Sequence, residues 1–243
     1  MVERLRARGD AVRALGRSEV WDWGADWGDV IYAVGLTADF RSRPFDTVEA
    51  HVGLLSQVLQ RAHFHSLLYL SSTRVYSGAV STAEDAVLCA RPGDPSDLYN
   101  LSKLLGESLC LTLDRPTVRV ARLSNVVGSE RAGSPDFIAE LERQAAAGCI
   151  RLASSPESAK DYIHIDDACN LLIEVARRGR ERIYNVASGA NIAHARWVAH
   201  FQSRTGCRVE VEPNAPVLRW APIDVARVRS EFDYTPRAVL CDV

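Results

Sequence analysis

Residues 66–76 read SLLYLSSTRVY, and residues 98–107 read LYNLSKLLGE. The first stretch begins as an apolar run of the length of one buried strand and ends in hydroxyl side chains. The second stretch has helical periodicity, which puts Tyr99 and Lys103, four residues apart, on one face. In parallel sheets, polar groups collect where the strands end. The two stretches therefore predict an α/β fold with a polar site at one edge of its sheet.

The rest of the chain alternates in the same way. Further strands are expected at residues 11–15, 29–35, 117–123, 148–153, 182–187 and 208–212. Helices are expected at residues 2–8, 46–62, 98–113, 136–147, 165–178, 192–204 and 223–232. Strands and helices joined by short links predict a mostly parallel sheet with right-handed crossovers and helices on both faces.

Composition excludes several classes of function. The chain has 243 residues, of which 47% are apolar and 25% are charged, and its net charge is -2. That charge argues against binding to nucleic acid through phosphate contacts. No apolar run reaches the roughly 18 residues of a membrane span, and no signal peptide is recognisable. The six cysteines have no close pairing, which predicts reduced thiols in a cytoplasmic protein and no metal site.

Tyr99 and Lys103 have the chemistry of an acid–base pair. A free phenol has a pKa of about 10 and is a poor acid or base at neutral pH. A nearby ammonium group stabilises the phenolate and lowers that pKa. Such a pair can exchange a proton with a substrate hydroxyl or ketone. The spacing alone is equally typical of an ordinary surface pair.

The hydroxyls that follow the strand at 66–71 strengthen this interpretation. Ser72 stands at the end of a predicted parallel strand, where active groups gather. Its hydroxyl could hydrogen-bond the substrate oxygen that Tyr99 protonates. Capping of a turn would explain the serines by themselves, but the two features together favour a site.

Six segments occur in the order found in extended short-chain dehydrogenases: DVIYAVG (29–35), LLYLSSTRVYS (67–77), LYNLSKLLGE (98–107), VRVARLSNVVG (118–128), KDYIHIDDACNLL (160–172) and RIYNVASG (182–189). They are similar to family patterns such as S-S-x-x-V-Y-G, Y-x-x-S-K-x-x-x-E and Y-N-V-G-S-G, and the match spans roughly residues 2–240. The chain resembles the extended short-chain dehydrogenase/reductase superfamily, in its NAD-dependent epimerase/dehydratase branch. The resemblance implies a Rossmann-like, doubly wound fold, an NAD or NADP cofactor and a nucleotide-sugar substrate.

The resemblance also implies roles for particular residues. Tyr99 would be the acid/base, Lys103 would lower its pKa and bind the nicotinamide ribose, and Ser72 would supply the third group of the triad. Beyond these, cofactor contacts are implied for Arg17, Gly35 and Ser71. Substrate contacts are implied for Thr73, Asn125 and Arg219, although Arg219 could equally be a surface arginine.

The beginning of the chain departs from the family. Relatives start with a strand and a G-x-x-G-x-x-G loop that holds the pyrophosphate. Here Met1 falls inside what should be the following helix, so this first strand and loop are expected to be missing. The loss of a central strand would leave neighbouring backbone groups unpaired, which is costly. Three explanations stay open: an internal start of the reading frame, pairing of the second strand (11–15) with the fourth (29–35), or a strand from another chain.

Arg17 and the tryptophans after it suggest two further contacts. In relatives an arginine at this place meets the 2′-phosphate of NADP, which favours NADP over NAD. Trp21, Trp23 and Trp27 are expected either in the core or in an exposed patch that covers the deleted region or contacts another subunit. The resemblance implies a homo-oligomer, with the helices at 46–62 and 98–113 as the dimer contact.

Together these features predict an NAD(P)-dependent epimerase or ketoreductase acting on a nucleotide sugar. Dehydration is disfavoured, because Thr73 and Arg74 replace the acidic residues that relatives use to protonate the leaving hydroxyl. A non-catalytic relative that binds a nucleotide or a partner protein is the alternative, and an oligomeric scaffold is a third.

The same resemblance divides the chain into two parts. Residues 1–123 would form a truncated nucleotide-binding domain, to which residues 160–187 also contribute. Residues 124–159 and 188–243 would form a smaller substrate lobe.

Overall fold

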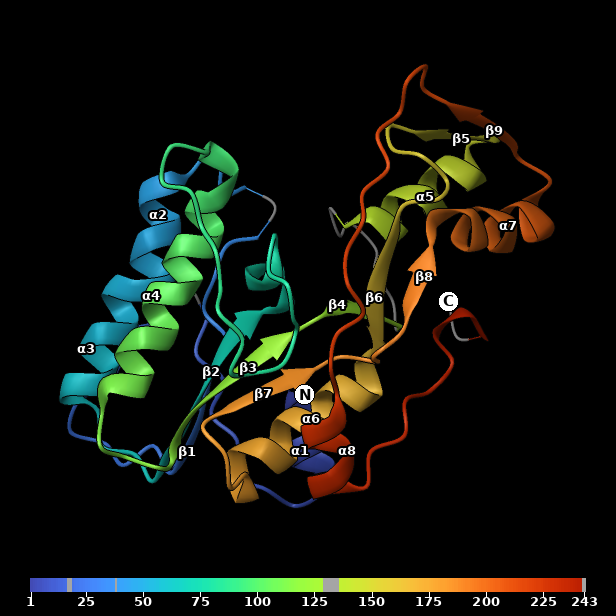
Figure 1. Cartoon of the computed structure of the whole chain (residues 1–243). Helices are drawn as coiled ribbons and strands as arrows, with labels where there is room; N and C mark the ends of the chain where they lie inside the picture. Colours follow the sequence, from blue (N-terminus) through green and yellow to red (C-terminus); the bar gives the residue numbers. More distant parts are fainter. Residues whose placement is uncertain (17–18, 38, 129–135, 242–243) are drawn as a thin grey trace.

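The protein is described by a computed structural model that covers residues 1–16, 19–37, 39–128 and 136–241. Its central feature is a four-stranded parallel sheet in the order β1–β2–β3–β7 (Figure 1). The strands are β1 (Asp29–Tyr32), β2 (Ser66–Ser72), β3 (Val118–Leu123) and β7 (Ile183–Val186). Each is a short apolar run, which suits a strand that is buried on both faces.

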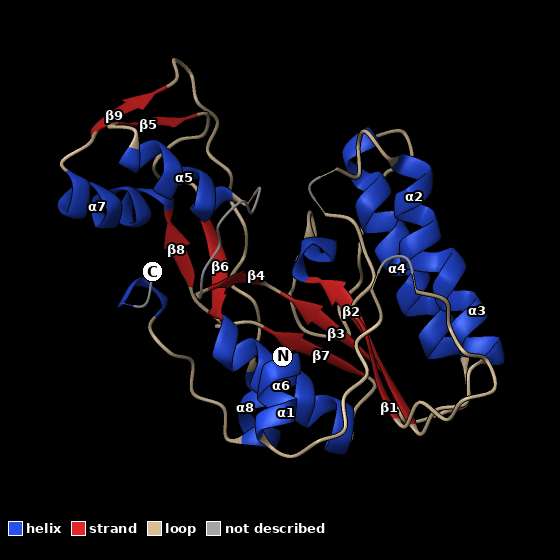
Figure 2. Ribbon diagram, turned by 180° about the vertical axis from the view of Figure 1, so that it is seen from behind, coloured by secondary structure: helices blue, strands red, loops and turns tan. Residues whose placement is uncertain are grey.

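Helices cover both faces of this sheet (Figures 1 and 2). On one face lie α2 (Pro44–Val48), a π-helical turn (Glu49–Gly53), α3 (Leu54–Arg61) and α4 (Leu98–Thr112). On the other lie α1 (Val2–Ala7), α6 (Ile165–Arg178) and α8 (Ala226–Phe232). The predicted α/β class, with a mostly parallel sheet and helices on both faces, is confirmed.

The side chains of β2 alternate between the two layers. Leu67 and Tyr69 pack with α3 and α4, whereas Leu68 packs with α6 and α8. All three are fully buried. Burial of one such side chain contributes about 1.5–3 kcal/mol to stability. The apolar run at residues 67–70 therefore joins the two helical layers.

A second group of elements lies beyond the sheet. It contains α5 (Phe137–Ala146), α7 (His194–Thr205), and the paired strands β5 (Cys149–Leu152) and β9 (Arg208–Val211). Their apolar side chains form a core around the fully buried Trp197. The strands β4 (Asn125–Val127), β6 (Ala159–His164) and β8 (Asn191–Ala193) lead from the main sheet towards it (Figure 1). The domain boundaries expected from the sequence stay a prediction.

The predicted strand at 11–15 is wrong. Residues 11–16 belong to no helix or strand, and β1 forms an edge of the sheet, hydrogen-bonded only to β2. The expected pairing of this segment with the strand at 29–35 is therefore wrong as well. A strand needs a neighbouring ladder for its backbone groups, and the described residues place none beside this segment.

The sequence patterns also do not predict β4, β6 and β8. The six residues of β6, AKDYIH, carry charged and polar side chains that break the apolar pattern. In the structure Asp161 is nevertheless buried, because distant groups hydrogen-bond it. No local pattern reports those partners.

Trp21, Trp23 and Trp27 form a cluster beside the edge strand β1. The rings of Trp21 and Trp23 stack with centroids 6.2 Å apart, and Trp27 lies 4.8 Å from Trp21. All three are half-buried and pack against the core between the sheet and α3. The cluster is therefore partly core, and its role as a contact with another subunit stays a prediction.

Two further observations concern the whole described chain. Of its helices, none is both long and apolar enough to cross a lipid bilayer. Five cysteines, Cys89, Cys110, Cys149, Cys169 and Cys207, are free thiols.

Candidate active site

Tyr99 and Lys103 lie on the face of α4 that packs against β2. Both are almost fully buried, at 6% and 5% exposure. The Lys103 ammonium donates a hydrogen bond to the Leu70 carbonyl near the end of β2, at 2.8 Å. Its nitrogen lies 6.0 Å from the centre of the Tyr99 ring. The helix thus brings both groups to the edge where the parallel strands end.

The phenol of Tyr99 sits among aromatic, hydroxyl and cationic groups. The ring centres of Phe40 and His51 lie 5.5 and 5.3 Å from its own, and the guanidinium carbon of Arg74 lies 5.7 Å away. Burial raises the pKa of Tyr99, while a hydrogen bond with Ser72 and the charge of Arg74 oppose the rise. The cation that acts on the phenol here is Arg74. The effect expected of Lys103 on this pKa stays a prediction.

Lys103 is itself strongly perturbed. Its burial lowers the pKa of the ammonium group to about 8, and the nearby Glu107 carboxylate offsets only part of that change. A lysine with such a pKa can release a proton as the ammonium and take one up as the neutral amine near neutral pH.

Gly35 follows β1 and lies close to the same group. A β-carbon at this position would come 2.9 Å from Nε2 of His51 and 3.5 Å from Nζ of Lys103. His51 is fully buried, and its Nδ1 hydrogen-bonds the Ser102 hydroxyl at 2.8 Å. Burial and the Lys103 charge lower the pKa of His51 to about 3, so its ring is neutral at physiological pH. A side chain at Gly35 would press against His51, so the glycine lets the chain pass close to His51 and Lys103.

A buried network fixes the end of β2. The Ser71 hydroxyl donates to Glu107 of α4, whose carboxylate pairs with Arg122 of β3 at 2.7 Å. Arg122 also donates to the hydroxyl of Tyr76, at 2.8 Å. Because its hydroxyl is held in the interior, any contact of Ser71 with a cofactor would come from its backbone. The network holds β2, β3 and α4 in register, and with them Ser72 and Tyr99.

The other residues predicted from the sequence lie at varying distances from this group. Thr73 is buried and begins the short helix Thr73–Tyr76 next to Ser72. Asn125 begins β4, is exposed, and donates through Nδ2 to the Asp161 carbonyl at 2.8 Å. Arg219 is exposed, and its backbone forms a bridge to Ala159 of β6. Arg17 lies outside the described residues.

The structure adds two residues that sequence reasoning did not place beside Tyr99. Phe40 comes from the loop between β1 and α2, which carries no motif. Arg74 appears in the sequence only as a departure from the dehydratase pattern, and its contact with the phenol depends on the turn after β2. The unusual arginine shortly after the Ser-Ser pair is the sequence feature that could have indicated a cation beside Tyr99.

The site fits one end of a nicotinamide dinucleotide. Lys103 matches the needs of a nicotinamide ribose, which presents hydroxyl groups to a donor, and Gly35 brings the chain close to it. For the pyrophosphate, no glycine-rich turn within the described ranges leads into a helix at this edge of the sheet. The described residues therefore fit the reacting end of the cofactor.

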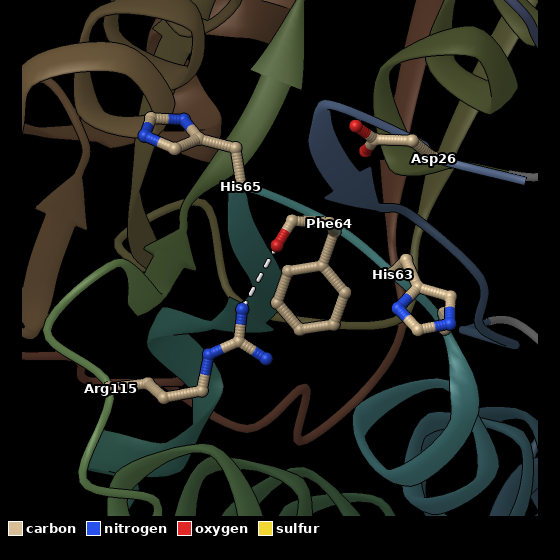
Figure 3. Close-up of a pocket in the computed structure, with 6 residues that line it drawn as sticks. Asp26, His63, Phe64, His65 and Arg115 are labelled. Carbon is tan, nitrogen blue, oxygen red and sulfur yellow. Dashed lines mark hydrogen bonds between the residues drawn. The ribbon is translucent and has the colours of Figure 1, made fainter.

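A separate cavity of about 310 Å³ lies at the opposite edge of the sheet, before β2 begins (Figure 3). Its lining includes Asp26, His63, His65 and Arg115, and Arg115 donates to the Phe64 carbonyl at 2.9 Å. Across the described ranges, no three His, Cys, Asp or Glu side chains are grouped to hold a metal ion. The cavity is remote from Tyr99 and carries none of the acid–base groups.

Several solved structures share this fold. One is RMD from Pseudomonas aeruginosa complexed with NADPH, with a TM-score of 0.77 and 20% identity over 98% of this chain and 90% of that chain. Another is MoeE5 in complex with UDP-glucuronic acid and NAD, with a TM-score of 0.79 and 20% identity over 99% of this chain and 92% of that chain. A third is UDP-glucuronic acid 4-epimerase from Bacillus cereus in complex with UDP-glucuronic acid and NAD. Its TM-score is 0.72, with 18% identity over 88% of this chain and 72% of that chain.

A comparison with curated proteins finds no match. The model of the NAD dependent epimerase/dehydratase family matches residues 28–187, which include every strand of the main sheet and the Tyr99 site. Together with the fold and the arrangement at the ends of its strands, this match shows that the chain belongs to the NAD dependent epimerase/dehydratase family.

Proposed function

We propose that this protein is an NAD(P)-dependent epimerase or ketoreductase that acts on a nucleotide sugar or a similar hydroxyl or ketone substrate. The observation that carries the proposal is the meeting of Ser72, Tyr99 and Lys103 at the carboxyl edge of the parallel sheet. Family membership and neighbours that bind NAD, NADPH and UDP-sugars support it.

In this proposal Tyr99 moves the proton. When a substrate ketone is reduced, the Tyr99 hydroxyl gives its proton to the carbonyl oxygen, and in the reverse direction the phenolate takes it back. Ser72 hydrogen-bonds the same oxygen and holds it in line with the phenol. The cofactor, when bound, supplies or accepts the hydride.

Lys103 stabilises the phenolate and holds the nicotinamide ribose, and Gly35 and the Ser71 backbone line the cofactor. Thr73 and Asn125 contact the substrate, as does Arg219 from the segment beside β6. The choice between NAD and NADP rests on Arg17, which favours NADP.

Cofactor binding tests the proposal most directly. We expect calorimetric titration with NADPH or NADH to show micromolar binding that weakens in Lys103→Ala. Failure of both cofactors to bind at millimolar concentration would contradict the proposal. It would favour the non-catalytic alternative, a protein that binds a nucleotide or a partner.

The Tyr99→Phe variant separates binding from chemistry. Because it removes only the hydroxyl, we expect cofactor affinity to stay within about threefold while turnover falls by about 10²–10⁴. Stopped-flow detection of nicotinamide absorbance with a panel of nucleotide sugars would measure it. Turnover close to that of the unaltered protein would remove Tyr99 from its role.

We further propose a homodimer formed through the outer faces of α2, α3 and α4. Phe45, Val48 and Leu105 are exposed there, at 88%, 39% and 50%. An exposed apolar surface of this kind is typical of a protein contact. Sedimentation analysis of Leu105→Glu, with Ser230→Glu at an exposed position of α8 on the opposite face of the sheet as control, tests this proposal, because only the first change should dissociate the dimer.

The free thiols support a reducing compartment. We therefore propose that the protein works in the cytoplasm. We also keep the division into a nucleotide-binding part and a substrate lobe as a proposal, to be tested by hydrogen exchange, in which two separate parts should open independently.

A further inference from the structure

Two arginines near Tyr99 share the same two partners. Arg74 donates through Nη2 to the Ser96 carbonyl at 3.2 Å, and Arg41 donates through Nη2 to the Ser96 hydroxyl at 3.1 Å. Both guanidinium groups also lie over the ring of Phe40, with Cζ at 5.3 Å for Arg74 and 4.5 Å for Arg41. Two positive charges are therefore held side by side.

The charges on Arg41 and Arg74 are only partly balanced inside the protein, where Asp94 and Asp97 offset part of the lowering of the Arg74 pKa. Within the described residues, Arg41, Arg74 and the nearby Lys160 form no ion pair. The Nε of Arg74 is buried and lacks any hydrogen-bond partner. A buried donor without a partner costs free energy unless a ligand satisfies it.

The two carboxylates whose charges act on Arg74, Asp94 and Asp97, make their hydrogen bonds to other groups. Asp97 accepts hydrogen bonds from the Arg91 backbone at 2.8 Å and from Asn100 at 3.0 Å. Asp94 accepts from the Ser96 backbone at 2.8 Å. Neither is positioned to pair with Arg74.

The cations also disturb one another. Burial and the charge of Arg41 lower the pKa of Arg74. Burial and the charge of Arg74 lower the pKa of Lys160, which lies in β6 on the side of the smaller group of elements. Like charges removed from water destabilise each other, and an anion between them would reverse the effect.

The location of the charges restricts what that anion can be. The guanidinium carbon of Arg74 lies 5.7 Å from the centre of the Tyr99 ring. The backbone N–H of Arg74 donates to the Ser72 hydroxyl at 3.2 Å. An anion bound there would lie next to the substrate oxygen on which Tyr99 acts. It would therefore be a group of the sugar itself. A planar carboxylate matches the fork of a guanidinium group.

We propose that Arg41 and Arg74 form a subsite for a carboxylate on the reacting sugar, which makes a nucleotide-linked uronate the substrate class. This inference rests on the proposed function, because it takes Tyr99 as the group that acts on the sugar. Arg74 is the specificity-determining residue of the subsite.

Paired ligands test the subsite. UDP-glucuronic acid and UDP-glucose differ only in a carboxylate against a hydroxymethyl group on the sugar. In calorimetry with saturating NAD(H) or NADP(H), we expect the unaltered protein to bind the uronate about 10-fold or more tightly than UDP-glucose. Arg74→Leu should weaken uronate binding by about 10- to 100-fold and leave UDP-glucose within about threefold. Arg91→Gln, an exposed arginine in the following loop, is the matched control and should change neither.

The stability of Arg74→Leu separates this role from a structural one. Since the change removes a repelled charge, we expect an unchanged or higher melting temperature together with the loss of uronate binding. If Arg74→Leu does not fold, Arg41→Gln, at an exposed position, provides the same test, with the same selective loss expected.

Three other outcomes are possible, and each of them would overturn the uronate subsite. Equal weakening of both ligands would show that the cations hold the diphosphate, which would overturn the uronate subsite. Binding of UDP-glucose without any preference for the uronate would overturn the subsite and leave the proposed function intact. Absence of binding by both sugars and by both cofactors would overturn the proposed function, and the subsite with it.

Discussion

Lys103 shows what burial does to a single charge. Its ammonium group is 5% exposed, makes one hydrogen bond to a backbone carbonyl, and forms no ion pair with any described carboxylate. Keeping the proton on this group in the folded state therefore costs free energy, which appears as the fall of its pKa to about 8.

This cost predicts a particular pH dependence of stability. From about pH 8 to about pH 10.5, the unfolded chain holds the Lys103 proton more tightly than the folded protein does. The contribution of Lys103 to stability therefore rises with pH through this window, and below it the full penalty applies. We expect Lys103→Met to be more stable than the unaltered protein by about 1–3 kcal/mol at pH 7, a gain that shrinks towards pH 10.5.

Urea unfolding of the two proteins at pH 7 and pH 10 measures this difference. Taking the difference between them cancels the titration of the other groups. A difference that stays constant with pH would mean that Lys103 keeps its ordinary pKa in the folded state.

At this scale the sequence predicts residue identities better than contacts. The spacing of Tyr99 and Lys103 predicts that both lie on one face of a helix, and the structure shows that this face of α4 is buried. It does not predict that the ammonium binds the Leu70 carbonyl, or that Arg74 is the cation over the phenol. Those contacts depend on how β2 and the turn after it meet the helix, which no local pattern encodes.

At the scale of elements, α4 and β2 approach each other closely. Gly106 of α4 faces the Tyr69 side chain of β2, and a β-carbon there would collide with the Tyr69 hydroxyl and come 2.9 Å from the His51 carbonyl. Tyr69 itself donates to that carbonyl at 3.3 Å. The missing side chain lets the helix lie against the strand and the π-helical turn together.

Gly106→Ala should therefore destabilise the protein. Alanine favours a helix over glycine by about 1 kcal/mol, but the clash in a packed core costs about 1–3 kcal/mol. We expect a net loss of up to about 2 kcal/mol in urea unfolding. Ser108→Ala, at an exposed position of the same helix, should show no loss. A stabilised Gly106→Ala protein would mean that the helix can move away from β2.

The predictions of elements from sequence fail where tertiary partners decide. Buried runs such as residues 66–71 and amphipathic stretches such as residues 98–113 carry their own signal, and both match β2 and α4 closely. The strand predicted at 11–15 has no neighbour, and β6 is polar in sequence but buried in the structure. Whether a marginal segment becomes a strand depends on what lies beside it.

At the scale of the molecule, one carboxylate joins the main sheet to the second group of elements. Asp161 of β6 is 4% exposed and accepts hydrogen bonds from the Ser124 hydroxyl at 2.6 Å and the Gly189 backbone at 2.7 Å. It also accepts from the backbone and hydroxyl of Ser188, at 3.0 and 2.9 Å. These donors follow β3 and β7, so Asp161 fixes the direction in which the chain leaves the sheet.

Asp161→Asn should loosen this connection. The amide keeps the shape of the side chain, but its NH₂ group would face N–H donors and leave them unpaired. Each lost bond to a buried charge is worth about 1.5–3 kcal/mol, so we expect a fall of about 3 kcal/mol or more in the free energy of unfolding. Hydrogen exchange should also accelerate in β6 and β8. Asp85→Asn, at an exposed position, is the control. Unchanged exchange in β6 would show that the connection is held by other contacts.

The stacked indoles beside β1 give the molecule an optical label at one edge. Trp21 and Trp23 lie nearly parallel, at 17°, whereas Trp197 is enclosed in the core between α5 and α7. Coupling between neighbouring indoles produces a circular dichroism signal that a solitary buried ring does not give. Detachment of residues 21–27 would remove that signal without disturbing the packing of Trp197. Loss of the coupled signal thus reports on the β1 edge of the protein during unfolding.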